Sequence, residues 1–115
     1  MAPLLCRELS TEAARKSVDP FMVTIALLTL DIHIPHAQSL KDKRMVVRRI
    51  KDRLRSKFNV SVSETDHQDL WQRTTISVAT VASDLEYARQ TLQLSLEESE
   101  RSAPECVVQG NIEIV

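Results

Sequence analysis

Two helix-start signals divide this chain into a repeating order of strands and helices. Ser39 is followed three residues later by Asp42, and Ser83 by Glu86, so each pair has the form of a capping box. After each signal, residues recur at helical spacing and define one helix face. These residues are Leu40, Val47, Ile50, Leu54 and Phe58 in the first segment, and Leu85, Ala88, Leu92, Leu96 and Ser99 in the second. The pattern predicts a helix over about 40–58 and another that ends before Pro104.

Four further segments have the residues of β-strands. Val23–Ile34 is apolar on both faces in its first half, which is typical of a central strand. Asn59–Thr65 and Thr74–Ala82 alternate apolar and polar residues, and Cys106–Val115 forms a last strand in which Gly110 predicts a bulge. The resulting order β-α-β-β-α-β predicts an α+β, ferredoxin-like fold. In it, the first and third strands are central in a four-stranded antiparallel sheet, and both helices cover one face.

The chain has 115 residues, 43% of them apolar, which suits one domain with a real core. We expect residues 1–21 to form a flexible N-terminal extension and residues 22–115 to form the domain. The alternative is a short helix around Thr11–Lys16 that docks on the domain. The chain shows neither a signal peptide nor an apolar stretch of membrane-spanning length, and its two cysteines show no disulfide or zinc spacing. We therefore expect a cytoplasmic location.

The first predicted helix is strongly basic. Between Lys41 and Lys57 there are nine basic and two acidic residues, whereas Phe58–Val115 has three arginines and ten acids. Such a dipolar layout favours an anionic partner for the helix. We predict that one sector of the helix contacts nucleic-acid phosphates through Lys41, Lys43, Arg44, Arg48, Lys51 and Arg55. The alternative is an ordinary solvated helix face.

A polar loop follows the second strand, over Glu64–Arg73. A structural hairpin anchored by Trp71 is the simplest interpretation. A loop that contacts a partner is the second, and its contacts would be Asp69, Trp71, Gln72 and Arg73, with Arg73 pairing with phosphate or with Asp69. A metal site built from Glu64, Asp66, His67 and Asp69 is a third interpretation, and we assign no metal ligands and no cofactor from it.

The uncovered face of the predicted sheet has few aromatic residues. The only aromatic residues in the chain are Phe21, Phe58, Trp71 and Tyr87, so base stacking on the sheet is not expected. Val23, Ile25 and Leu27 would instead form an aliphatic patch that favours a homodimer. Tyr87 and Leu94 lie opposite the apolar side of the second helix and could extend an interaction surface.

Several strings are similar to the YlxP-like family, bacterial proteins with a domain of unknown function. These are His33-Ile34-Pro35, Ser39-Leu40-Lys41-Asp42-Lys43-Arg44, Phe58-Asn59-Val60-Ser61-Val62, and Glu64 with His67-Gln68-Asp69-Leu70-Trp71-Gln72-Arg73. The resemblance covers about residues 22–115. It implies a ferredoxin-like fold, and it implies a role near translation or ribosome maturation because the family's genes often lie beside those for initiation factor two and ribosome-binding factor A. It implies no catalytic residues.

Together these features predict a non-catalytic accessory protein that associates with RNA or the ribosome. The basic helix and the resemblance motivate this prediction. One alternative is a protein-protein interaction module that dimerises through the open sheet face. Another is a regulatory domain that binds a small molecule or a metal.

Overall fold

The computed structural model describes residues 23–115, and the predictions made for residues 1–21 lie outside them. The described elements are β1 (Thr24–His33), α2 (Leu40–Lys57), β2 (Ser61–Asp66), β3 (Arg73–Ala82), α3 (Leu85–Ser102) and β4 (Val107–Ile114). This is the predicted order, and each strand and helix begins and ends close to its predicted bounds.

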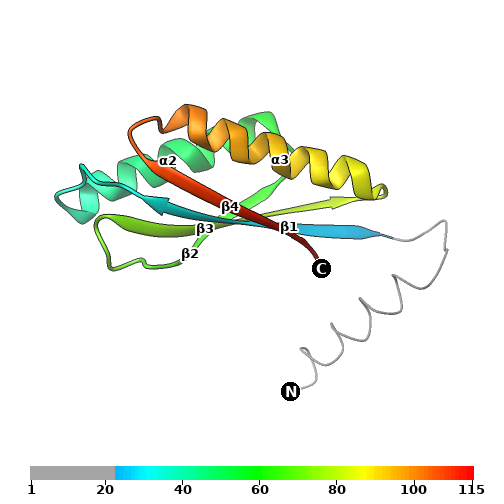
Figure 1. Ribbon diagram of the computed structural model, residues 1–115, viewed down its shortest axis with the longest axis horizontal. Coiled ribbons are helices and arrows are strands. Elements are labelled where there is room, and N and C mark those ends of the chain that lie inside the picture. The colour runs from blue at the N-terminus through cyan, green and yellow to red at the C-terminus, as the bar shows by residue number, and fades with distance from the viewer. Residues whose placement is uncertain (1–22) are drawn as a thin grey trace, which may run out of the picture.

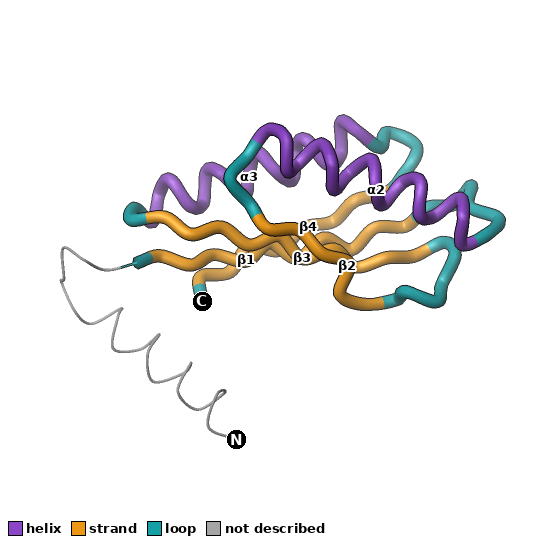
Figure 2. The backbone as a smooth tube through the Cα atoms, turned by 180° about the vertical axis from the view of Figure 1, so that it is seen from behind, coloured by secondary structure: helices purple, strands orange, loops and turns teal. Residues whose placement is uncertain are grey.

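The four strands form one antiparallel sheet in the order β2-β3-β1-β4. The prediction that the first and third strands are central is therefore confirmed. Figure 1 shows α2 and α3 side by side above one face of the sheet, and Figure 2 shows the same two layers from behind. Among residues 23–115, no element covers the other face. This arrangement is the ferredoxin-like fold.

The core lies between the sheet and the helices. Along β1, the residues from Ala26 to Ile32 that face the helices are fully buried, while those between them face the open side. Ile50 and Leu54 of α2 and Leu92 of α3 are also fully buried. Each of the leucine and isoleucine side chains among them contributes roughly 1.5–3 kcal/mol to folding. Removal of these apolar stripes from water fixes both helices on the sheet.

The two helices begin in slightly different ways. Ser39 caps α2, its hydroxyl accepting from the backbone N–H of Asp42 at 3.1 Å, as predicted. The carboxylate of Asp42 in turn accepts from the N–H of Gln38 at 3.0 Å. In α3, however, the cap is Asp84, which accepts from the N–H of Tyr87 at 3.2 Å. The prediction that Ser83 caps this helix is wrong by one residue, because a carboxylate in the next position is an equally good acceptor.

Gly110 forms no bulge. It pairs with Leu30 in an uninterrupted register between β1 and β4. A Cβ atom at this position would lie 2.8 Å from the Leu96 side chain of α3 and 3.1 Å from Leu28. Gly110 therefore gives Leu96 room to approach the sheet.

The buried face of α3 is largely polar. Thr91, Ser95, Ser99 and Ser102 are buried, and each hydroxyl donates to a backbone carbonyl oxygen of the preceding turn. Leu85, predicted to lie on this face, is exposed instead. Each buried hydroxyl is therefore hydrogen-bonded within the helix, and the small side chains permit close packing.

Glu98 completes this face as a buried acid among cations. Its carboxylate lies 3.2 Å from Lys57 and 3.8 Å from Arg53 of α2, and 2.6 Å from Arg101 of α3. Burial raises the pKa of Glu98, but the hydrogen bond from Lys57 and the charges of the three cations outweigh burial, so its pKa lies below the ordinary value. This cluster joins the C-terminal half of α2 to α3.

The Glu98 cluster predicts a pH-dependent contribution to stability. A lowered pKa in the folded state means that the ionised group stabilises the fold above its unfolded pKa, near 4.5, and that this contribution is lost as the pH falls through the folded value. We expect Glu98→Gln to lower the free energy of unfolding at neutral pH, with the difference from wild type shrinking only as the pH falls below about 4.5. Urea unfolding across a pH series measures this. Glu100→Gln, at an exposed position of the same helix, is the control, and equal pH dependence in both variants would contradict the assignment.

Candidate functional site

The cations of α2 divide into two sides of the helix. On the side toward α3 and the start of β4, Arg49 pairs with Glu105, while Arg53 and Lys57 pair with Glu98. These ion pairs join α2 to α3 and to the segment before β4. They were not among the predicted phosphate contacts, and their pairing leaves the other side of the helix as the candidate site.

The other side of α2 faces the β2 edge and is hollowed. Arg44, Arg48, Lys51 and Arg55 line a groove of about 380 Å³, together with Val47, Asp52 and Glu64 of β2. We call this surface the basic groove. Its four cations recur at intervals of four, three and four residues, so they follow one stripe along the helix. Arg55 donates to the backbone oxygen of Val62 at 3.0 Å, whereas Arg44, Arg48 and Lys51 make no ion pair within residues 23–115.

Lys43 does not belong to this exposed set. Its side chain is 1% exposed, and its ammonium lies 3.0 Å from a carboxylate oxygen of Glu64. The ammonium also donates to the backbone oxygens of His67 at 2.7 Å and Gln68 at 2.9 Å. These three acceptors match the three donors of an ammonium group. The prediction that Lys43 contacts phosphate is therefore wrong, because its charge is buried and fully bonded. Lys41 is exposed in the first turn but lies outside the basic groove.

Glu64 and Asp66, at the end of β2, are bonded to neighbouring groups of the domain. Glu64 pairs with Lys43 and also accepts from the Thr74 hydroxyl at 2.6 Å. Asp66 accepts from the N–H of His67 at 2.7 Å, and the His67 ring lies 2.9 Å from the Thr75 hydroxyl. Within residues 23–115, no three His, Cys, Asp or Glu side chains form a group that could hold a metal ion. The geometry therefore gives no support to the alternative of a metal site in this loop.

The loop after β2 is anchored by Gln72 and Lys43. The side-chain amide of Gln72 donates to the backbone oxygens of Pro35 at 3.2 Å and Ala37 at 3.1 Å, and the backbone oxygen of Gln72 accepts from the N–H of Ile34 at 2.9 Å. The side chain of Trp71, by contrast, is exposed. Its expected role as the anchor of the hairpin is wrong, because the loop is tied down through backbone oxygens.

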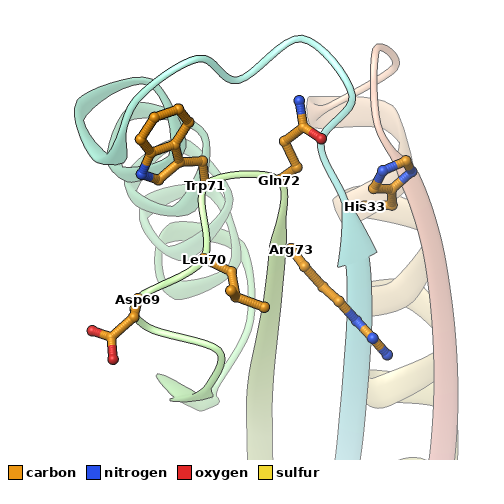
Figure 3. A pocket seen from close by; sticks show the side chains of 6 residues that line it. All are labelled: His33, Asp69, Leu70, Trp71, Gln72 and Arg73. Carbon is orange, nitrogen blue, oxygen red and sulfur yellow. The ribbon is translucent and has the colours of Figure 1, made fainter.

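Arg73 pairs across the sheet. Its guanidinium makes two hydrogen bonds to the carboxylate of Asp31 on β1, at 3.2 and 3.0 Å. The expected pairing of Arg73 with Asp69 is not present. The hydrogen bond from Arg73 lowers the pKa of Asp31 below its ordinary value. Figure 3 shows the Arg73 side chain extending from β3 toward β1, where Asp31 lies.

A second cavity lies at the end of the sheet. It has a volume of about 480 Å³ and is lined by His33, Asp69, Leu70, Trp71, Gln72 and Arg73. Figure 3 shows Leu70 and Trp71 leaving the loop in different directions, with Arg73 and His33 on the neighbouring strands. We call this the loop cavity. It brings together all four residues that were expected to contact a partner, and His33 and Leu70 are additions that only the fold reveals.

The open face of the sheet has an aliphatic end. Ile25 of β1 pairs in register with Val81 of β3, and both side chains are largely exposed, as is Val23. Of the expected aliphatic patch, Val23 and Ile25 are exposed and Leu27 is half-buried, while Val81 is an additional exposed member. The opposite end of the same face has the Arg73–Asp31 pair.

Comparison with known proteins identifies the family. The fold is that of the ferredoxin-like class, and a de novo designed protein with a ferredoxin fold, LFR1 1, superimposes with a TM-score of 0.52 at 15% identity, covering 77% of this chain and 84% of the design. A cofactor-independent oxygenase from Streptomyces nogalater, SnoaB, gives 0.50 at 10% identity, covering 77% and 90%. At these identities both show the fold alone.

A family model described as a protein of unknown function (DUF503) matches residues 25–109, so the chain belongs to that family. The chain is also 49% identical over 57 residues to the uncharacterised protein YlxP of Bacillus subtilis strain 168. That alignment covers 50% of this chain and 62% of YlxP, which is less than two thirds of the relative's length. The resemblance seen in the sequence is confirmed. No helix within residues 23–115 is long and apolar enough to cross a membrane.

The buried ammonium of Lys43 predicts a large effect of its removal on stability. Lys43→Met would delete a bond to Glu64 and leave two loop carbonyl oxygens without their donor. Breaking a buried ion pair from one side costs about 3–5 kcal/mol. We expect a loss of that size in the free energy of unfolding, measured with urea. Lys41→Met removes the same charge from an exposed position and should change stability by less than about 0.5 kcal/mol. Equal effects of the two variants would mean that the Lys43 contacts stabilise nothing.

Proposed function

We propose that this protein is a non-catalytic accessory protein that binds RNA, with the ribosome or its RNA as the physiological setting, through phosphates that lie in the basic groove. The observation that carries the proposal is the presence of four cations in one groove, three of them without an ion pair among the described residues. Arginine and lysine side chains free of protein carboxylates are the groups that replace condensed counterions on a nucleic acid.

The acids beside the groove do not cancel its charge. Glu64 is shared with the buried ammonium of Lys43, so that its charge is already balanced from inside the domain. Asp52 is then the remaining acid against the four cations that line the groove. An anionic ligand therefore meets a net positive surface, and the planar guanidinium of Arg44 or Arg48 can contact a phosphate with two donors.

Salt dependence tests the proposal most directly. If each of the four cations neutralises one phosphate of single-stranded RNA, log K should fall with log salt at a slope of about −3, since each contact contributes roughly 0.7. We expect Arg48→Glu to weaken binding and to reduce the magnitude of this slope by about 0.7, the contribution of one contact. Binding of the purified protein to ribosomal subunits and to naked ribosomal RNA, measured across a salt series, gives both quantities.

Arg89→Glu is a matched control for this experiment. It changes the net charge by the same amount, but Arg89 lies on α3 beside Ile112 and Ile114 of β4, at the other edge of the sheet. A specific groove predicts a large effect for Arg48 and a small one for Arg89. Equal losses would indicate non-specific attraction, and no binding at low salt would reject RNA as the ligand and favour an acidic protein.

A protein-protein module that dimerises through the open sheet face is the second candidate. Ile25 and Val81, which are 42% and 59% exposed, pair on this face, and Val23, which is 56% exposed, directly precedes β1. Burial of such a patch between two copies would remove apolar area from water and stabilise a homodimer.

Light scattering over a concentration series distinguishes a monomer from this dimer. We expect a mass that rises toward twice that of the chain if the patch mediates association, and Val81→Asp should return the protein to a monomer by placing a charge in the contact. Val107→Asp, an equally exposed valine at the other end of the face, serves as the control. A strict monomer at all concentrations would remove this candidate.

A further inference from the structure

The loop that exposes Trp71 is held in one conformation. Lys43 donates to the backbone oxygens of His67 and Gln68, and the N–H of Leu70 donates to the oxygen of His67 at 3.2 Å. His67 has a φ of 61°, in the left-handed region that non-glycine residues rarely occupy. On the other side of Trp71, Gln72 is bonded to three backbone groups of the segment that joins β1 to α2. Trp71 is therefore presented by a fixed scaffold.

This scaffold exposes apolar side chains. Trp71 is 53% exposed and Leu70 is 47% exposed, at the loop cavity of about 480 Å³. Apolar surface of this kind on a well-anchored loop is typical of a binding site, because its exposure is otherwise unfavourable. The polar side chains of Gln72 and Arg73 are occupied by Pro35, Ala37 and Asp31. His33 and Asp69 also line the cavity, and the indole and Leu70 supply its exposed apolar surface.

The loop cavity and the basic groove are adjacent. Glu64 lines the groove, and its carboxylate contacts the Lys43 ammonium at 3.0 Å. The same ammonium contacts the loop through the oxygens of His67 and Gln68. This buried side chain therefore links the groove wall to the loop that carries Leu70 and Trp71. Arg44 directly follows Lys43, so the end of the groove at Arg44 is the end nearest to this loop.

We infer that the loop cavity binds an unpaired nucleobase of the same RNA strand whose phosphates lie in the basic groove, with the base stacked on Trp71. This inference rests on the proposed function and adds that the ligand is single-stranded at this point. Proteins that bind single strands combine a cationic groove for the backbone with an aromatic side chain for a base, and a base inside a duplex cannot reach such a ring. The four groove cations and the single exposed indole provide this combination on adjacent surfaces.

Trp71 is the only tryptophan in the chain, so its fluorescence reports on this site alone. We would titrate the full chain with a short single-stranded oligoadenylate and with an abasic strand of the same length and charge, and record tryptophan emission and affinity. The expected result is quenching by the oligoadenylate and none by the abasic strand. The abasic strand should also bind more weakly, by roughly 5- to 150-fold, which corresponds to the loss of one stacked base.

Two variants separate stacking from folding. Trp71→Ala should weaken oligoadenylate binding by a similar factor, leave the salt slope unchanged and abolish the preference over the abasic strand. Trp71→Phe keeps a ring and should retain most of the preference. Because Trp71 is exposed, both variants should unfold at the wild-type temperature.

The outcomes for the two proposals differ. Equal affinity for both strands with unchanged emission would overturn the base pocket while leaving the phosphate groove intact. Absence of salt-dependent binding to either strand would overturn the groove, and the base pocket with it. Quenching by a fully paired duplex as strong as that by the single strand would also overturn the pocket, since its bases are not available to the indole.

Discussion

The buried ammonium of Lys43 is the contact on which the rest of the surface depends. It lies between α2, the end of β2 and the following loop, and each of its three donors has an acceptor. A buried charge is expensive unless it is paired and hydrogen-bonded, and here Glu64 supplies the pairing while two carbonyl oxygens supply the remaining bonds. The contact fixes the position of the loop after β2 relative to α2. It therefore fixes both the wall of the basic groove and the position of Trp71.

The same helix performs different tasks on its different sides. Toward α3, Arg53 and Lys57 stabilise the ionised form of Glu98 and join the two helices. Toward β2, Arg44, Arg48 and Lys51 have no such partners among the described residues. The net charge of the helix is therefore larger than the charge available to a ligand, because some of its cations are already paired with acids of the domain. The distinction between paired and unpaired cations is what makes the groove a candidate site rather than a solvated face.

The fold could be predicted from the sequence because its signals are local: capping residues, helical spacing and strand alternation. The role of Lys43 was missed although a signal existed, since it stands three residues after Leu40 and four before Val47, on the apolar stripe of the helix. Glu98 is likewise on the buried face of α3. Other contacts were not accessible in this way. Arg73 reaches Asp31 only because β1 and β3 pair in a particular register, and the anchoring role of Gln72 depends on where the segment before α2 passes.

The two candidate activities use different parts of the surface. In the register of β1 and β3, Ile25 lies opposite Val81 and His33 lies opposite Arg73, so the aliphatic patch and the loop cavity are eight residues apart along β1. At about 3.4 Å per residue, that is roughly 27 Å. The basic groove lies beside β2, along α2, on the helix side of the sheet.

A dimer formed at the aliphatic end would therefore leave both grooves and both loop cavities accessible. Two linked sites would bind one RNA more tightly than either alone, since the second contact becomes intramolecular. Self-association and RNA binding are thus compatible in this fold, and a dimer would strengthen the proposed activity.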